Sequence, residues 1–534
     1  MRSVMEHSFS VVPEANIPRS VFNRSCSHKT TMAADLLIPI FLDEIYPADT
    51  INMDATIFVR TATLEKPIMD NMFIDTFWFF VPNRLVWDDS ASSWQRFMGE
   101  RTPDPDSSID FTVPVIDLGA GGATAHSLAD YFGIQIGVAN QEVVALPFRG
   151  YNLIFNEWFR SQDLTDSVTV DKDAGPDAIT DYVPLKRCKK RDYFTSCLPS
   201  PQVGDAIDIP LGTEAPVLGI GKASTTYDAG ATAVYESGGN TDTYNPSALI
   251  DNSGNYIFAV ERDASDTDHP YIRADLTNAT AATINSLRLA FSLQKMVERD
   301  QRSGTRYVEM VEAHFGTKSP DLRATRPIFL GGSTQRFHVA PVPQTSETST
   351  TLQGNLAAYS LAVLDNDRIT YSFTEHGYLF CLANIRGDQT YQQGTPRFLD
   401  PNSRSTREDF YFPAMAHIGE QAVLVGEIYT DGTNDDTVFG YNEAWADLRY
   451  KPSMITGVFR SGHANTLDVW HLSEQFGSEP SLNDTFIRAN MPIDRVSSVS
   501  SPANDSFFYV DAHFRYKHVR ALPVFSVPGL IDHF

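Results

Sequence analysis

The segment Phe508-Tyr509-Val510-Asp511-Ala512-His513-Phe514-Arg515-Tyr516-Lys517 alternates between two kinds of side chain along most of its length. One set is apolar or aromatic and would face a core: Phe508, Val510, Ala512, Phe514 and Tyr516. The other set would face solvent: Asp511, His513, Arg515 and Lys517. A period of two is that of a β-strand with one buried face. The segment therefore predicts a half-buried strand, and with it a fold built on sheets.

Two segments nearer the start of the chain predict further strands. Residues 52–60 alternate in the same way and place four apolar side chains on one side: Met53, Ala55, Ile57 and Val59. Residues 74–81 form instead a run that is apolar and aromatic apart from Asp75 and Thr76 and stops at Pro82. A run of this kind is typical of a strand that is covered on both faces.

Helical patterns are fewer and fall between the predicted strands. Short helices are predicted at 92–98 and 151–160. Residues 283–302 predict a longer helix that meets Gly304 and has five apolar side chains on one face: Leu289, Ala290, Leu293, Met296 and Val297. Strands separated by long connections, with helices confined to those connections, indicate a mainly β fold, an antiparallel sandwich with long loop insertions and a few helices.

The composition is that of a globular protein without a membrane segment. The chain has 534 residues, of which 42% are hydrophobic and 20% charged. No stretch approaches the roughly 18 apolar residues that a membrane helix needs, so no membrane insertion is expected. Residues 1–7 lack the apolar core of a signal peptide, so the chain is expected to stay in the cytoplasm that makes it. The 4 cysteines contain no Cys-x-x-Cys pair, and we expect neither a disulfide framework nor a structural zinc site.

The formal net charge of −25 bears on any role with nucleic acid, because a phosphate backbone attracts Lys and Arg. Two arrangements would reconcile such a charge with a nucleic-acid partner. The acidic residues could lie on an outer surface around a locally basic interior, or small basic proteins could neutralise the nucleic acid. We expect both to act together.

The densest positive run lies between 186 and 191, with Tyr182, Tyr193 and Phe194 nearby. Cations interleaved with aromatic rings can hold a single strand through phosphate attraction and base stacking. A subunit interface or a solvated turn is the alternative for these five cations: Lys186, Arg187, Lys189, Lys190 and Arg191. Near the start, Pro13 and Pro18 suggest an extended arm, which could touch nucleic acid or tie subunits together through Arg19, Arg24, His28 and Lys29.

The sequence lacks residues that known catalytic and metal-binding motifs require. Gly221-Lys222 is followed by Ala223, and Pro216 stands where a P-loop needs its first glycine. No Gly-x-Ser-x-Gly elbow occurs, and no pair of carboxylates can be nominated for sugar cleavage. Neither the spacing of His513, His518 and His533 nor the turn 431–436 forms a recognised ligand set. We expect no enzyme activity, no metal and no cofactor; the rival function is a carbohydrate-binding, lectin-like jelly roll.

Several short segments, which match no catalytic motif, follow one another in an order that carries a family resemblance. They include 77–87 (FWFFVPNRLVW), 191–201 (RDYFTSCLPSP), 299–307 (RDQRSGTRY) and 528–534 (PGLIDHF). In this order they resemble the major capsid proteins of gokushoviruses, small single-stranded DNA phages of the Microviridae. Two stretches depart from the pattern: residues 88–93 make a longer connection between Trp87 and Trp94 than expected, and residues from about 218 to 272 match nothing in the family.

The resemblance implies an eight-stranded antiparallel jelly roll of the viral capsid type. It also implies a T=1 icosahedral shell of sixty copies, built through pentamers around a circular single-stranded DNA genome. The chain would then divide into a first part of the jelly roll with an N-terminal arm (1–212), a surface insertion near the three-fold axis (213–272) and a second part with the C-terminal segment (273–534). Its place would be the virion, after assembly in the bacterial cytoplasm.

The partners that the resemblance implies are other copies of the chain, the packaged DNA, a small basic DNA-binding protein, an internal scaffolding protein, a minor pilot protein and a host surface receptor. Small polar residues dominate from Gly219 to Asp268, yet apolar and aromatic residues recur too often for a simple linker. We therefore expect an ordered protrusion, held by neighbouring copies, that mediates host attachment. The tyrosines proposed to contact a receptor or the three-fold neighbours are Tyr227, Tyr235, Tyr244 and Tyr256.

Overall fold

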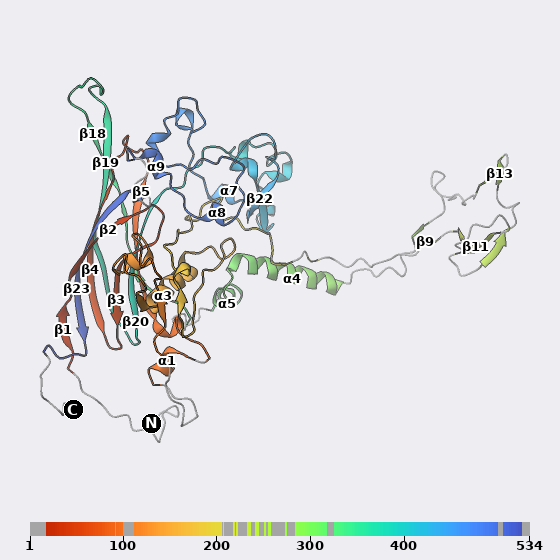
Figure 1. The fold of residues 1–534 in the computed structure, drawn as a ribbon. Helices are drawn as coiled ribbons and strands as arrows, with labels where there is room; N and C mark the ends of the chain where they lie inside the picture. Colours follow the sequence, from red (N-terminus) through yellow and green to blue (C-terminus); the bar gives the residue numbers. More distant parts are fainter. Residues whose placement is uncertain are drawn as a thin grey trace, which may run out of the picture. The chain divides into compact units, whose positions relative to one another are not determined.

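The computed structural model describes residues 18–90, 92–99, 112–204, 207, 284–317, 325–499 and 506–525, together with short strands between 217 and 274. Contacts divide the chain into two compact units. The first consists of Met1–Pro201 and Gly304–Phe534, and the second of Gln202–Ser303. The structure is mainly β, as the strand patterns predicted, and Figure 1 shows its elements.

Two antiparallel sheets form the centre of the first unit. The first sheet has the order β1-β23-β4-β19-β18, with β2 also paired to β23: β1 (Ser20–Asn23), β2 (Cys26–Met32), β4 (Thr50–Thr61), β18 (His338–Pro343), β19 (Leu356–Ser372) and β23 (Phe508–Arg520). The second has the order β16-β5-β20-β3, with β17 also paired to β5: β3 (Ile38–Ile45), β5 (Met72–Pro82), β16 (Ile328–Gly331), β17 (Thr334–Arg336) and β20 (Gly377–Gly387).

The order of these strands is that of a jelly roll. From β2 to β5 the chain changes sheet at every step, and it changes again from β17 to β18, from β19 to β20 and from β20 to β23. The result is four strands in the order β2-β23-β4-β19 against four in the order β3-β20-β5-β16/β17. The predicted eight-stranded antiparallel jelly roll is therefore confirmed, with β1 and β18 as additional edge strands.

The main core lies between the two sheets. The apolar side chains of 508–517 are buried and the alternate ones exposed, as predicted. The ring of Phe514 lies 4.9 Å from that of Phe41 on β3 and 6.1 Å from that of Trp78 on β5, so it joins the two sheets. The indole of Trp78 donates a 2.8 Å hydrogen bond to Asp367 on β19, which gives this buried carboxylate a partner.

A second core covers the other face of the second sheet. Helix α3 (Leu146–Ile154), which continues as a π-helical turn over Phe155–Phe159, packs with Phe79 and Phe380. A Cβ on Gly150 would meet the Phe380 ring at 3.1 Å, so the helix approaches the sheet closely at this glycine. Because both faces of the second sheet are buried, β5 is apolar and aromatic on both sides, as predicted, apart from the buried Asp75 and Thr76. The outer face of β4 and β23 is exposed and keeps the alternating pattern.

Two long connections carry the remaining elements. Residues 83–327, between β5 and β16, contain the second unit and several short elements: α1 (Trp94–Phe97), β6 (Val115–Asp117), α2 (Leu128–Tyr131), β7 (Glu142–Val144), β8 (Asp177–Ala178) and α5 (Tyr307–Phe315). Residues 388–507, between β20 and β23, pack around a third core with Tyr193 and Phe194: β21 (Glu420–Leu424), β22 (Val438–Glu443), α7 (Ala446–Arg449), α8 (Asp484–Ile487) and α9 (Ile493–Val496).

The predicted helices are found with shifted ends. The helix at 92–98 is α1, and Ser93 caps it by accepting a hydrogen bond from the amide of Arg96. Asp88 and Ser93 pair as a short β-bridge, and the Trp87 and Trp94 rings lie 6.3 Å apart. The helix predicted at 151–160 begins earlier, at Leu146, with Pro147 in its first turn.

The second unit holds α4 (Ile284–Ser303), the long helix predicted at 283–302. Its strands form small antiparallel pairs and a three-stranded sheet: β9 (Val217–Leu218), β10 (Ile220–Lys222), β11 (Thr232–Glu236), β12 (Thr241–Tyr244), β13 (Ile250–Asn252), β14 (Asn255–Ile257) and β15 (Arg273–Ala274). Among the residues that the structure describes, no helix is both long and apolar enough to cross a membrane.

Replacing Phe514 by alanine tests whether the contact between the sheets dominates stability. Phe514 is fully buried against both sheets, so Phe514→Ala is expected to lower the free energy of unfolding by about 3–5 kcal/mol. The matched control is Tyr509→Ala, on the exposed face of the same strand, with an expected change below about 1 kcal/mol. Urea unfolding of the unassembled chain measures both, and equal losses would contradict this account of the core.

Candidate nucleic-acid interface and subunit surfaces

The basic run 186–191 is held between two other segments of the chain. On one side the amide of Arg187 donates to the carbonyl of Asp35, just before β3. On the other side the amide of Lys189 donates to the carbonyl of Ile487, in α8, and the amide of Ala489 donates back to Arg187. The run is therefore a fixed part of the first unit, and its extended backbone sends alternate side chains in different directions.

Two of the five cations point inward and pair with carboxylates. The guanidinium of Arg187 lies 2.8 Å from Asp75 on β5, a carboxylate that also receives a 2.8 Å hydrogen bond from Arg386. Burial alone would raise the pKa of Asp75, but the hydrogen bonds of Arg386 and Thr334 lower it. The ammonium of Lys189 is buried 2.5 Å from Glu474 and lies over the ring of Phe486. Both cations hold the chain together.

The other cations of the run face solvent or lie close to it. Lys190 and Arg191 are exposed, and Lys186 is half-buried, with its ammonium 3.3 Å from Asn490. Partial burial, followed by the nearby charge of Arg386, lowers the pKa of Lys190.

Two open hollows flank this run, and residues 187–191 line both. The larger hollow, of about 410 Å³, also contains Trp158 and Phe329, whose rings lie 5.7 Å apart and are partly exposed. The smaller, of about 310 Å³, adds Arg386 and Lys451. We call the larger one the basic hollow, because Lys190 and Arg191 line it beside these rings. Cations next to exposed rings are the chemistry that holds single-stranded nucleic acid.

The aromatic residues that the sequence placed beside this run do not reach it. Tyr182, Tyr193 and Phe194 are all buried, and the two tyrosine hydroxyls donate to Asp177 and Glu427. They are not available to stack on bases in this chain. The rings that lie beside the exposed cations are instead those of Trp158 and Phe329, on opposite sides of a long insertion. The sequence did not indicate them, because 170 residues separate the two and Phe329 lies in an ordinary strand pattern.

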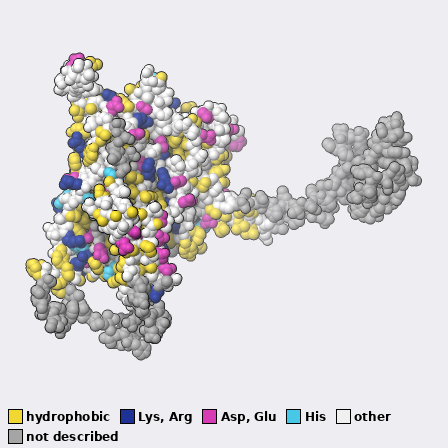
Figure 2. Space-filling model, in the orientation of Figure 1, with side chains coloured by type: hydrophobic (Ala, Val, Ile, Leu, Met, Phe, Trp, Pro, Cys, Tyr) yellow, Lys and Arg dark blue, Asp and Glu magenta, His cyan; other side chains and the backbone are white. Residues whose placement is uncertain are grey.

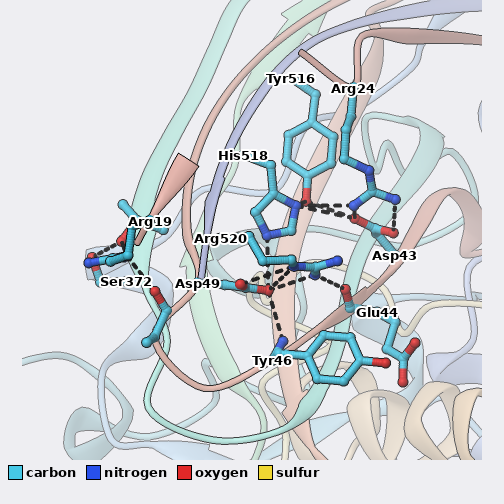
Figure 3. A network of polar contacts seen from close by, with 12 residues as sticks. Arg19, Arg24, Asp43, Glu44, Tyr46, Asp49, Ser372, Tyr516, His518 and Arg520 are labelled. Carbon is cyan, nitrogen blue, oxygen red and sulfur yellow. Dashed lines mark hydrogen bonds and ion pairs between the residues drawn. The ribbon is translucent and has the colours of Figure 1, made fainter. Parts of the chain in front are cut away.

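The N-terminal cations enter a polar network at one end of the jelly roll (Figure 3). Arg24 forms an ion pair with Asp43 of β3, and the Tyr516 hydroxyl donates to the same carboxylate at 2.7 Å. Arg520, at the end of β23, donates at 2.6 Å to Asp49, which lies 2.9 Å from Nε2 of His518. Burial, followed by the charge of Arg520, lowers the pKa of His518. This network ties β1 and β23 to the turn before β4.

The remaining N-terminal candidates lie close to this network or on the exposed sheet. The Arg19 guanidinium donates at 2.9 Å to the Thr50 hydroxyl, and one ring nitrogen of His28 lies 2.8 Å from the carbonyl oxygen of Ile40. Lys29 is exposed on β2, with its ammonium 3.5 Å from Asp511. The Lys and Arg side chains visible on the face in Figure 2 are interspersed with Asp and Glu and do not form one large patch.

The tyrosines proposed for the protrusion fall partly outside the described residues. Tyr227 lies outside them. Tyr235 is on β11 and Tyr244 on β12, two strands that pair with each other, and Tyr256 is on β14. In the paired strands Tyr235 stands opposite Thr241 and Tyr244 opposite Thr232, so the two tyrosines occupy opposite ends of this pair.

The histidines and the acidic turn are engaged in other contacts. The ring of His513 lies 2.9 Å from the Ser27 hydroxyl on the exposed face of β23, whereas His518 is buried in the network above; His533 lies outside the described residues. In the turn 431–436 the Asp435 carboxylate accepts from the amides of Asp431 and Gly432. The part of the chain that the structure describes holds no group of three or more His, Cys, Asp or Glu residues placed to bind a metal ion.

Comparison with known proteins agrees with this architecture over the full length of the chain. The model of the phage capsid protein (F protein) family matches residues 10–530. The chain is 44% identical to the capsid protein VP1 of Bdellovibrio phage phiMH2K, covering 99% of this chain and 98% of the relative. It is 39% identical to that of Chlamydia phage 1 (99% and 98%) and 36% identical to that of Spiroplasma virus 4 (98% and 97%). The predicted resemblance to gokushovirus capsid proteins is confirmed: the chain belongs to the phage F capsid protein family and is a structural protein of the virion, not an enzyme.

Proposed function

We propose that this capsid protein assembles into a T=1 icosahedral shell of sixty copies, built through pentamers, around a circular single-stranded DNA genome. The observation that carries the proposal is the combination of full-length family membership with an eight-stranded jelly roll whose insertions expose large apolar side chains. Within 388–507 these include Phe398, Leu399, Phe410, Leu448, Tyr450 and Met454. Exposed apolar surface of this kind mostly marks contacts with other molecules.

Expression of the chain with the other phage proteins tests the shell. We expect closed particles by electron microscopy and a sedimentation coefficient that fits sixty copies. Mass measurement of the purified particle gives the copy number directly. A chain that stays monomeric under conditions in which its relatives assemble would contradict the proposal.

We propose further that Lys190 and Arg191, in the basic hollow, contact the packaged DNA, with Lys186 beside them. Arg187 and Lys189 each pair with a carboxylate, so they would support this surface without contacting DNA themselves. Arg19, Arg24 and Lys29 form a second candidate surface, of which Lys29 is the most exposed. At a net charge of −25 the chain would bind DNA weakly by itself, so a small basic companion protein would supply much of the neutralisation.

The double variant Lys190→Ser/Arg191→Ser tests the basic hollow. Losing two phosphate contacts should lower the slope of log affinity against log salt by roughly 1.4 for single-stranded DNA. Titration of oligothymidine at several salt concentrations measures this slope, and the DNA content of purified particles should fall as well. The matched control is Arg515→Ser/Lys517→Ser, two exposed cations on β23. Equal losses in both variants would show that total charge, rather than the hollow, governs binding.

We also propose that residues 213–272 form the protrusion near the three-fold axis and mediate attachment to the host. Three of the four candidate tyrosines lie on strands of this segment, which supports an ordered rather than a linker-like structure. Loops carried by a rigid scaffold are common places for recognition, and tyrosine is favoured in contact anchors.

Replacement of residues 218–268 by a short Gly-Ser link tests attachment. The jelly roll makes its own cores, so particles should still form while adsorption to host cells is lost or redirected. The quadruple variant Tyr227→Ser/Tyr235→Ser/Tyr244→Ser/Tyr256→Ser should weaken adsorption in the same direction. Adsorption rates of purified particles measure both. Particles that lack the segment and adsorb to the same host at the same rate would remove the receptor role.

A further inference from the structure

The long connection between β20 and β23, residues 388–507, leaves an apolar groove open to solvent. The groove has a volume of about 620 Å³ and lies beside the third core. Its apolar lining includes Phe398 and Leu448, which are 65% and 61% exposed, together with Phe410, Tyr411, Tyr450 and Met454. A contiguous apolar surface surrounded by polar groups is the usual sign of a docking site for another protein segment.

The charges of this groove are positive in a strongly acidic chain. Five cations and two carboxylates line it. Both carboxylates are neutralised in place: Glu427 lies 2.7 Å from Arg397, and Asp447 lies 2.6 Å from Arg404. Of the other three cations, Arg449 pairs with Glu443, whereas Lys451 and Arg460 form no ion pair with any described residue. The groove therefore suits an apolar segment that carries negative charge.

The chain contains a segment of this composition after its last strand. Beyond β23 the side chains of Leu522, Val524 and Phe525 are exposed, and Phe525 is 81% exposed. The sequence then continues with Val527, Leu530, Ile531 and Phe534, and residues 521–534 contain no Lys or Arg and a single acid, Asp532. Pro523 and Pro528 restrict the backbone toward extended conformations, which lowers the entropy lost when such a segment binds.

The end of β23 and the insertion that carries α7 and β22 lie at different ends of the jelly roll (Figure 1). Arg520 binds Asp49, and the neighbouring Ala48 amide donates to Phe373, in the turn between β19 and β20. The groove lies past the opposite end of β20, where Tyr391 follows Gly387. The 11 residues of β20 span roughly 35 Å. Residues 526–534 reach about 30 Å when fully extended, too short to run back along β20.

We infer that the groove binds the end of this segment, residues 526–534, of a second copy of this chain, with Asp532 at the edge formed by Lys451. The inference rests on the proposed self-assembly and names one contact that would drive it. Because the segment and the groove are different surfaces, the contact is head-to-tail, and such contacts generate rings when the rotation between copies closes. Each copy then donates one segment and receives one.

The test uses the full-length unassembled chain and a fluorescent peptide of residues 521–534. We expect saturable binding of one peptide per chain by anisotropy. Leu448→Asp places a charge in the apolar groove and should weaken binding about tenfold or more. The matched control is Leu352→Asp, since Leu352 is 74% exposed in the loop between β18 and β19, outside the groove; this variant should bind the peptide as the unmodified chain does.

A charge exchange separates recognition from any effect on folding. Lys451→Glu should weaken binding of the unmodified peptide, and a peptide with Asp532→Lys should recover affinity for this variant while losing it for the unmodified chain. Failure of the peptide to bind the unmodified chain, or equal affinities for Leu448→Asp and Leu352→Asp, would overturn the inference. If shells form but the peptide does not bind, the inference fails and the proposed shell stands. If the peptide binds as described but shells never form, the docking contact stands and the shell fails.

Discussion

The structure depends on one constraint: the sheet β3-β20-β5-β16 carries large apolar side chains on both faces, and both faces must be covered. The sheet that contains β4 and β23 covers one face through contacts such as Phe514 with Phe41 and Trp78. The other face is covered by α3, where Gly150 allows close approach to Phe380. A chain that placed only its jelly-roll strands would leave the second face in water. Part of the long connection after β5 is therefore needed to cover this sheet, whatever partner the rest of it contacts.

The strands were predictable where a single physical pattern governs them. β23 and β4 each have one buried face, so their alternation is visible in sequence. β5 is buried on both faces, so its sequence is mostly apolar and shows no alternation. β19 is harder, because its register against β4 shifts between Leu364 and Asp367 and interrupts the alternation. The order of strands was not readable from periodicity at all; it followed only from the family resemblance, since pairing is set by contacts hundreds of residues apart.

The candidate site shows why a basic run is weak evidence by itself. Arg187 and Lys189 look like surface cations in sequence, yet they pair with Asp75 and Glu474, which lie 112 and 285 residues away. An ion removed from water needs such a partner, and the partner is visible only in three dimensions. The same reasoning explains Arg24 and Arg520, whose carboxylates come from the segment 43–49. Within the run 186–191, the cations that remain for an outside anion are those that the fold does not pair, above all Lys190 and Arg191.

The net charge of −25 then poses the question of how copies of this chain approach one another. At physiological ionic strength charges are screened over about 8 Å, so the repulsion between two copies is decided by the charges near the contact rather than by the total. The contact inferred here places an apolar segment with one acid against an apolar groove with two cations, Lys451 and Arg460, that no described carboxylate pairs. Local attraction replaces overall repulsion at this one place, while the acidic remainder of the surface stays in solvent and opposes association in other arrangements. An acidic surface thus favours specific assembly, because it leaves few places where two copies can touch.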